Sequence, residues 1–214
     1  MGVANSKGQR EYYVFDNSLL NTFSSEYAEK AQKDGQCLRE LRRVTVEPLT
    51  DILENWLPDD QSIDFLNVDV ESMELEVLQS LDWNKYRPRI IAVEDLKFRP
   101  TKPEQSTICT FLKDLQYVLF SVCSITLIFF DLHVIVRPAE TWLASRIAEL
   151  TGIEADKVDV NTGFEQLGLS SVEIAKLTKE IEDRTGVPLE PSAAWEHLTL
   201  REFVRHVVLL IYCG

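Results

Sequence analysis

The sequence is short of the residues that most often build metal and disulfide sites. Its four cysteines form no Cys-x-x-Cys pair, and none of its three histidines has a second ligand at metal-binding spacing. We therefore expect neither a disulfide framework nor a metal ion. There is also no Gly-x-Ser-x-Gly elbow, phosphate-binding loop or nucleophilic cysteine setting, so hydrolase and nucleoside-triphosphatase chemistry has no support.

Basic residues are outnumbered as well, with 22 Lys and Arg against 35 Asp and Glu and a formal net charge of -13. Because nucleic acids and anionic membranes are polyanions, this charge disfavours both as partners and favours basic ones. The longest apolar run, residues 117–130, is too short to cross a bilayer and predicts two buried strands. With no secretory pattern at the N-terminus, we expect a cytoplasmic protein.

The first portion of the chain, residues 1–137, alternates β-rich runs with helical stretches. This alternation of strands and helices predicts a layered α/β sheet. Nearly continuous apolarity over residues 63–70 predicts a strand buried on both faces. The expected elements are 44–57 (strand, then helix), 63–70 (strand), 72–83 (helix), 87–96 (strand), 107–115 (helix) and 117–130 (two strands).

The second portion, residues 138–214, has a helical pattern throughout and predicts a small all-α bundle. Pro138 interrupts the preceding pattern. One helix is expected to end at Gly186, and another to begin at Thr199 with a capping box. The aromatic residues expected to anchor its core are Phe164 and Trp195.

The segment LGLSSVEIAKL, residues 167–177, places two adjacent serines between a glycine turn and the start of a helix. Ser170 and Glu173 have the spacing of a capping box, so a purely structural interpretation accounts for Ser170. Ser171 is expected at the first helical position, with its hydroxyl pointing outward. The positive end of the helix dipole favours an attached anion there.

The stretch LGLSSVEIAKLTKEIEDRTGVPLEPSAAWEHLT resembles the acyl carrier protein domains of polyketide synthases, over about residues 140–210. The resemblance implies that Ser171 receives a covalent 4'-phosphopantetheine arm from a phosphopantetheinyl transferase. Ser170 takes the place of the family's aspartate, and both residue types cap helices. The arm would tether acyl or aminoacyl thioester intermediates in polyketide or nonribosomal-type biosynthesis, and the carrier itself would catalyse nothing.

Carriers of this family present an acidic helix after the serine to the basic surfaces of assembly-line enzymes. The helix after Ser171 holds charges of both signs, and the alternative is an ordinary solvated helix face. We favour the partner surface because it follows Ser171 directly. Its acidic residues are Glu173, Glu180, Glu182 and Asp183, and its basic residues are Lys176 and Lys179.

Carboxylates follow the expected buried strands of the first portion. Asp69 and Glu71 stand at the C-terminal end of one strand, where open α/β sheets keep their ligand crevices. Glu94 and Asp95 end the next strand and are expected at the same crevice. Asp69 and Glu71 would orient a hydroxyl acceptor or act as a base. For Glu71, the alternative is that it begins the next helix, where negative charge is favoured.

The stretch IDFLNVDVESMELEVLQSLDWNKYRPRIIAVE resembles FkbM-type S-adenosylmethionine-dependent methyltransferases, and the similarity runs from about Tyr12 through Phe130. The resemblance implies a partial Rossmann-like sheet with Asp69 and Glu71 in catalytic positions. Asn67 and Ser72 stand where the family commonly has lysine and glycine.

Glycine is missing where such an enzyme needs it, because the eight glycines form no Gly-x-Gly turn to let the backbone approach the cofactor. We therefore expect the C-terminal part of a methyltransferase fold, which binds S-adenosylmethionine only when the fold is completed. Such a part leaves a sheet edge and an apolar face uncovered. Three explanations of this incomplete domain remain open: a fragment of a longer protein, a decayed enzyme, or a split enzyme that another chain completes.

The sequence thus predicts a methyltransferase-like domain over residues 1–137 and a carrier domain over residues 138–214. The function is expected in the carrier, with Ser171 as the residue that holds the cofactor. The rival is an O- or N-methyltransferase of the same pathway. A non-catalytic interaction fragment is a third possibility.

Overall fold

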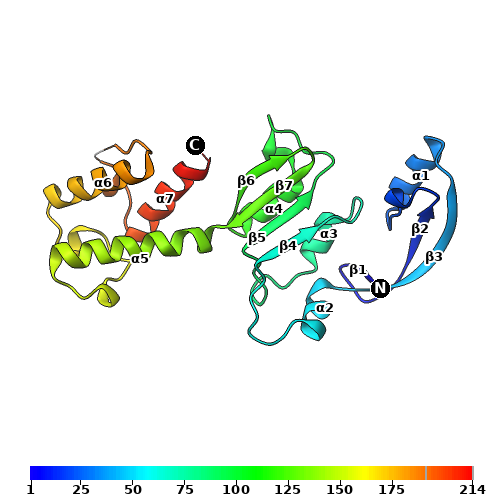
Figure 1. The fold of residues 1–214 in the computed structure, drawn as a ribbon, viewed down its shortest axis with the longest axis horizontal. Helices are drawn as coiled ribbons and strands as arrows, with labels where there is room; N and C mark the ends of the chain where they lie inside the picture. Colours follow the sequence, from blue (N-terminus) through cyan, green and yellow to red (C-terminus); the bar gives the residue numbers. More distant parts are fainter. Residues whose placement is uncertain (191, 214) are drawn as a thin grey trace. The chain divides into compact units, whose positions relative to one another are not determined.

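The structure, a computed structural model, describes residues 1–190 and 192–213 (Figure 1). The chain forms two compact units, Met1–Asp131 and Leu132–Gly214. Within the described residues, no helix combines the length and apolar content that a membrane crossing requires. Cys37, Cys109 and Cys123 are free, and the side chain of Cys213 lies outside the described part.

A hairpin and a helix form the N-terminal layer of the first unit. The hairpin strands pair antiparallel, and the short first strand joins β3 in parallel. The helix begins where the Ser24 hydroxyl accepts the Tyr27 N–H, and it buries Ala28 and Ala31 against Phe15. The sequence predicts only the end of this hairpin, from Val44 onward. Its elements are β1 (Gly2–Val3), β2 (Gly8–Phe15), α1 (Ser25–Lys33) and β3 (Leu38–Glu47).

The second sheet of this unit has the strand order β4-β5-β7-β6. β4 and β5 are parallel, whereas β7 runs antiparallel to both of its neighbours. Side chains of α2, α3 and α4 join one face of the sheet in a core around Ile91, Val93, Leu127 and Phe129. The elements are α2 (Leu49–Trp56), β4 (Phe65–Val68), α3 (Glu74–Gln79), β5 (Ile90–Glu94), α4 (Thr107–Asp114), β6 (Tyr117–Cys123) and β7 (Thr126–Asp131).

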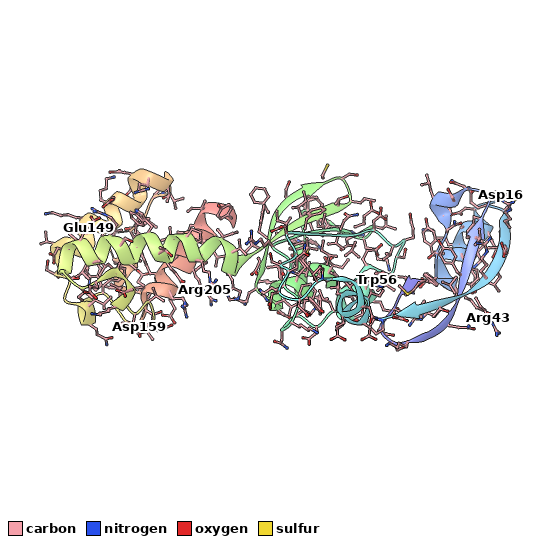
Figure 2. The ribbon with its side chains drawn as sticks, turned by 60° about the horizontal axis from the view of Figure 1, so that its bottom comes forward. Asp16, Arg43, Trp56, Glu149, Asp159 and Arg205 are labelled. Atoms are coloured by element: carbon pink, nitrogen blue, oxygen red, sulfur yellow. The ribbon has the colours of Figure 1, made fainter. Side chains whose placement is uncertain are left out.

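The other face of this sheet is apolar and open. Phe65 is 57% exposed, and Phe120, which is 49% exposed, packs edge-on against Phe130. The prediction that residues 63–70 form a strand buried on both faces is wrong, because the helices pack on the opposite face and β4 is an edge strand. β4 therefore forms an open edge of this sheet, and the truncation of the domain stays a prediction. Trp56, at the end of α2, also points into solvent (Figure 2).

The second unit is the predicted helical bundle. Its core contains Leu143 and Ile147 from the first helix, Ile174 and Leu177 from the second, and Phe203 from the third. Short 3-10 turns connect these helices. The helices are α5 (Leu132–Thr151), α6 (Ser171–Thr185) and α7 (Leu200–Cys213).

α5 differs from the sequence prediction at Pro138, because the helix begins at Leu132 and continues through the proline. A proline removes one backbone hydrogen bond, and the burial of Leu132 and Val136 stabilises this first part of the helix nonetheless. The assignment of residues 138–214 to the carrier domain stays a prediction.

Of the two expected aromatic anchors, only one lies in the core. Phe164 is buried, and its ring packs edge-on against Phe203 with centroids 5.3 Å apart, so this prediction is confirmed. Trp195 is 43% exposed, and its prediction is wrong. Trp195 ends a 3-10 turn, Ala193–Trp195, in which Ala193 and Ala194 are the buried residues, so the adjacent indole lies at the surface.

Candidate functional site

α6 begins at the predicted serine turn. Ser170 is the N-cap residue, and its hydroxyl accepts the Glu173 N–H at 3.4 Å. Glu173 Oε2 in return accepts the Ser170 N–H at 2.7 Å and the Ser170 hydroxyl at 2.6 Å. The predicted capping box is therefore confirmed. The same hydrogen bonds hold the pKa of Glu173 below its ordinary value.

The residues before α6 place the two serines at the surface. Leu169 is buried, and Gly168 has φ 86, in the left-handed region that favours glycine. Ser171 follows as the first helical residue and is exposed. None of the described residues hydrogen-bonds to its hydroxyl. An exposed primary hydroxyl beside the unpaired N–H groups of a helix end is chemically suited to carry a phosphodiester.

The acidic residues of α6 are partly neutralised within the chain. Glu180 pairs with Arg146 of α5 at 2.9 Å. Glu182 and Asp183 share Lys179, each at 3.2 Å. The helix therefore presents a mixed surface near its C-terminal end, and its least compensated negative charge lies at Glu173, next to Ser171.

In the first unit, the parallel pairing of β4 and β5 brings the strand-end carboxylates together. Burial raises the pKa of Glu71, and the negative charges of Asp69 and Glu94 raise it further. Burial and Asp69 likewise raise the pKa of Glu94. The structure thus unites Asp69, Glu71 and Glu94 as predicted. A carboxylate with a raised pKa is a better proton acceptor than an ordinary one.

The turn that carries Glu71 is held in an unusual conformation. Glu71 has φ 52 and Ser72 has φ 80, both in the left-handed region. The buried Thr22 hydroxyl donates to the Glu71 carbonyl at 2.9 Å and accepts the Ser24 N–H at 3.0 Å. This hydroxyl links the start of α1 to the strand end.

Two other carboxylates here have structural partners. Glu74 is buried, and its Oε1 accepts the N–H groups of Val70 at 3.3 Å and Ser72 at 3.1 Å. Sequence reasoning missed Glu74, although a carboxylate just after a tight turn is a recognisable signal. Asp95, expected at the crevice, lines the cavity beside this turn, and its Oδ2 also accepts the Ser106 hydroxyl at 2.6 Å, which fixes the start of α4.

A cavity of about 460 Å³ lies beside this turn, a volume typical of small-molecule sites. It is bounded by α1, the turn before α3 and the segment after β5, and its polar lining includes Tyr27, Lys30, Ser72 and Lys97. Burial and the charge of Glu71 raise the pKa of Tyr27. Among the described residues, no group of three or more His, Cys, Asp or Glu side chains is arranged to hold a metal ion.

Comparisons with known proteins give one match in each unit. The family model for the FkbM methyltransferase domain matches residues 1–119, and the model for phosphopantetheine attachment sites matches residues 141–207. No curated protein and no solved structure matches the chain. The strand-end carboxylates lie within the first matched region, and Ser171 lies within the second.

Proposed function

The chain belongs to the FkbM methyltransferase family and also contains a phosphopantetheine-attachment domain, and from this we propose that it works as a carrier. Ser171 bears the 4'-phosphopantetheine arm. Acyl or aminoacyl intermediates are bound to this arm as thioesters and are carried between the enzymes of a polyketide or nonribosomal-type pathway. The carrier contributes tethering, which raises the effective concentration of the intermediate at each enzyme.

The observation that supports this proposal is the exposed hydroxyl of Ser171 at the first position of α6. In loading, Ser171 Oγ forms a bond to the arm's phosphorus and the pyrophosphate bond of coenzyme A breaks. The nucleotide part leaves as adenosine 3',5'-bisphosphate, and the hydroxyl proton passes to the transferase. The new phosphodiester lies against the helix N-terminus, where negative charge is stabilised.

The attachment domain implies a phosphopantetheinyl transferase as a partner. Beyond it, we assign basic-surfaced assembly-line enzymes as partners, since the whole chain has a net charge of -13. Glu173 offers such partners a carboxylate beside the arm, whereas the acidic residues further along α6 are paired with Lys179 and Arg146.

The methyltransferase domain implies the use of S-adenosylmethionine. The described residues of the first unit do not fit this cofactor by themselves. At the end of β4, the left-handed positions hold Glu71 and Ser72 rather than glycine, so their side chains limit how closely the backbone of this turn approaches a ligand. We therefore assign no reaction step to the cofactor in this chain alone.

A second candidate function is an O- or N-methyltransferase that another polypeptide completes. The open edge of β4 and the raised pKa of Glu71 favour it. In this function, Asp69 orients the acceptor and Glu71 takes its proton. Saturable binding of S-adenosylmethionine to the chain alone would contradict the need for completion.

Intact mass spectrometry after incubation with a phosphopantetheinyl transferase and coenzyme A tests the carrier function. We expect a single added arm, which is absent from the Ser171→Ala variant. The matched control is Ser170→Ala, which loses a helix cap but keeps the attachment hydroxyl and is still loaded. Loading of the Ser171→Ala variant, or no loading of the folded wild-type chain, would refute the proposal.

A further inference from the structure

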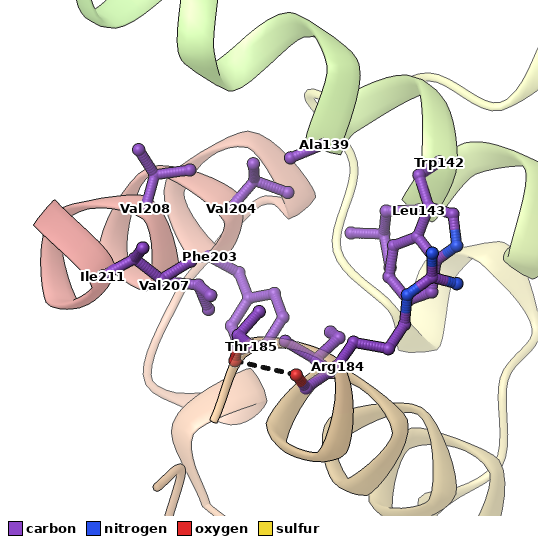
Figure 3. A pocket seen from close by; sticks show the side chains of 11 residues that line it. Ala139, Trp142, Leu143, Arg184, Thr185, Phe203, Val204, Val207, Val208 and Ile211 are labelled. Atoms are coloured by element: carbon purple, nitrogen blue, oxygen red, sulfur yellow. Dashed lines mark hydrogen bonds between the residues drawn. The ribbon is translucent and has the colours of Figure 1, made fainter. Parts of the chain in front are cut away.

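The second unit contains an apolar cavity that the carrier function does not use. It has a volume of about 100 Å³ and opens between α5, α6 and α7 (Figure 3). Trp142 and Leu143 line it from α5, Ile181 from α6, and Val204 and Val207 from α7. Its walls are almost entirely carbon.

The size of the cavity limits what it accepts. A cavity of about 150 Å³ holds one benzene molecule, whereas sites for whole small molecules reach about 300–1,000 Å³. At about 100 Å³ this open cavity is smaller than both, so it suits a branched alkyl group or the edge of one aromatic ring. One side chain of another protein has that size.

Arg184 places a positive charge at the rim. Its guanidinium lies over the Trp142 indole, 4.8 Å from the ring centroid, as Figure 3 shows. Stacking leaves the N–H edge of a guanidinium available for a carboxylate. None of the described acidic residues pairs with Arg184, because its neighbours on α6, Glu182 and Asp183, are paired with Lys179.

The apolar surface also continues beyond the cavity along α7. Val207, Val208 and Ile211 line the cavity, whereas Leu209 lies beyond it, and Leu209 and Ile211 are each 40% exposed. Exposed apolar side chains beside an apolar cavity are typical of a protein interaction surface. A small ligand in the cavity would leave Leu209 in water, so a protein surface is the better match.

We infer that this groove docks an amphipathic helix of a partner protein. A leucine side chain or the edge of an aromatic ring of the partner fills the cavity, and a carboxylate one helical turn away binds Arg184. The groove lies at the end of α6 opposite to Ser171, because Arg184 comes 13 positions after Ser171, about 20 Å along the helix. The bound partner therefore leaves the attachment serine free.

Fluorescence anisotropy with the full-length, arm-free chain tests the inference. The probe is a designed, labelled helical peptide with one Phe and, one turn later, one Glu. We expect saturable binding that weakens about tenfold when the Glu of the peptide is replaced by Gln. Arg184→Gln should abolish that preference, whereas Lys176→Gln, which removes an exposed charge elsewhere on α6, should preserve it.

Two variants fill the cavity from different helices, Val207→Trp from α7 and Ala139→Leu from α5. Each should weaken peptide binding by about tenfold or more. Circular dichroism shows whether each variant is folded, independently of whether Ser171 is loaded. Failure of the carrier function is thus distinguishable from failure of this inference.

Several results would overturn the inference. One is peptide binding that neither folded cavity-filling variant weakens, and another is no binding of the peptide to the wild-type chain. Phenylacetate that binds as tightly as the peptide would make the cavity a small-carboxylate site. Self-association of the chain that Val207→Trp abolishes would make a second copy the occupant.

Discussion

The candidate site residues of the two units are held by different kinds of structure. In the second unit, the exposed Ser171 hydroxyl stands on one turn of chain that is capped by Ser170 and Glu173. The methyltransferase unit has an open sheet, and its carboxylates depend on two parallel strands and a strained turn. A site built from neighbouring residues depends on local sequence, whereas a site assembled from several elements depends on how those elements pack.

The largest difference should appear between two phenylalanines, one in each unit. Phe203→Ala removes a ring that is 1% exposed, and it should lower the free energy of unfolding by about 3–5 kcal/mol. Phe65→Ala, on the open sheet face, should change it by less than about 0.5 kcal/mol. Urea unfolding measures both. Equal effects would mean that the open face is covered in solution.

A buried carboxylate gives the next largest effect. Glu74→Ala leaves the N–H groups of Val70 and Ser72 without their acceptor, which should cost about 1–3 kcal/mol in the free energy of unfolding. Glu54→Ala, which breaks only a surface ion pair with Lys85, is the matched control and should cost much less, because solvent screens an exposed pair. If the two variants unfold alike, Glu74 does not hold the turn.

Substitutions at left-handed backbone positions should change the stability of the two units in opposite directions. Ser72→Gly relieves a left-handed serine with φ 80 and should stabilise the first unit by about 1 kcal/mol. Gly168→Ala introduces a side chain at φ 86 and should destabilise the carrier unit by about as much. Thermal unfolding of both variants gives the comparison. A loss of stability in Ser72→Gly would show that the serine side chain is required there.

The two units should also respond oppositely to pH. The folded-state pKa of Glu71 is raised above its ordinary value of 4.5, so ionisation of this carboxyl opposes folding. The stability of the first unit should therefore fall as the pH rises from 4.5 through the folded-state pKa. The pKa of Glu173 is lowered, so its contribution is present above 4.5 and is lost as the pH falls through the folded pKa. Carboxyl NMR titration of wild type, Glu71→Gln and Glu173→Gln measures both. Shifts of the same sign would refute the contrast.

Local signals predicted the start of α6 well. The spacing of Ser170 and Glu173 was enough to locate the start of α6, because a cap involves only neighbouring residues. The carboxylates at the ends of β4 and β5 were also predictable, since parallel strands align their carboxyl ends. The roles of Ser171, Asp69 and Glu71 remain predictions.

Features that depend on distant parts of the chain were not predictable. The exposure of Phe65 follows from the absence of packing on one sheet face, which an apolar strand sequence does not reveal. Pro138 lies inside a helix because buried side chains around it outweigh one lost hydrogen bond. The α5–α7 cavity requires three helices to meet, so no spacing along the sequence encodes it.

The Thr22 hydroxyl joins the turn that carries Glu71 to the entrance of α1. It is shielded from water and bonds both the Glu71 carbonyl and the Ser24 N–H, while Ser24 borders the larger cavity. The entrance of α1, which borders the cavity, and the backbone of Glu71 are therefore linked through one buried hydroxyl.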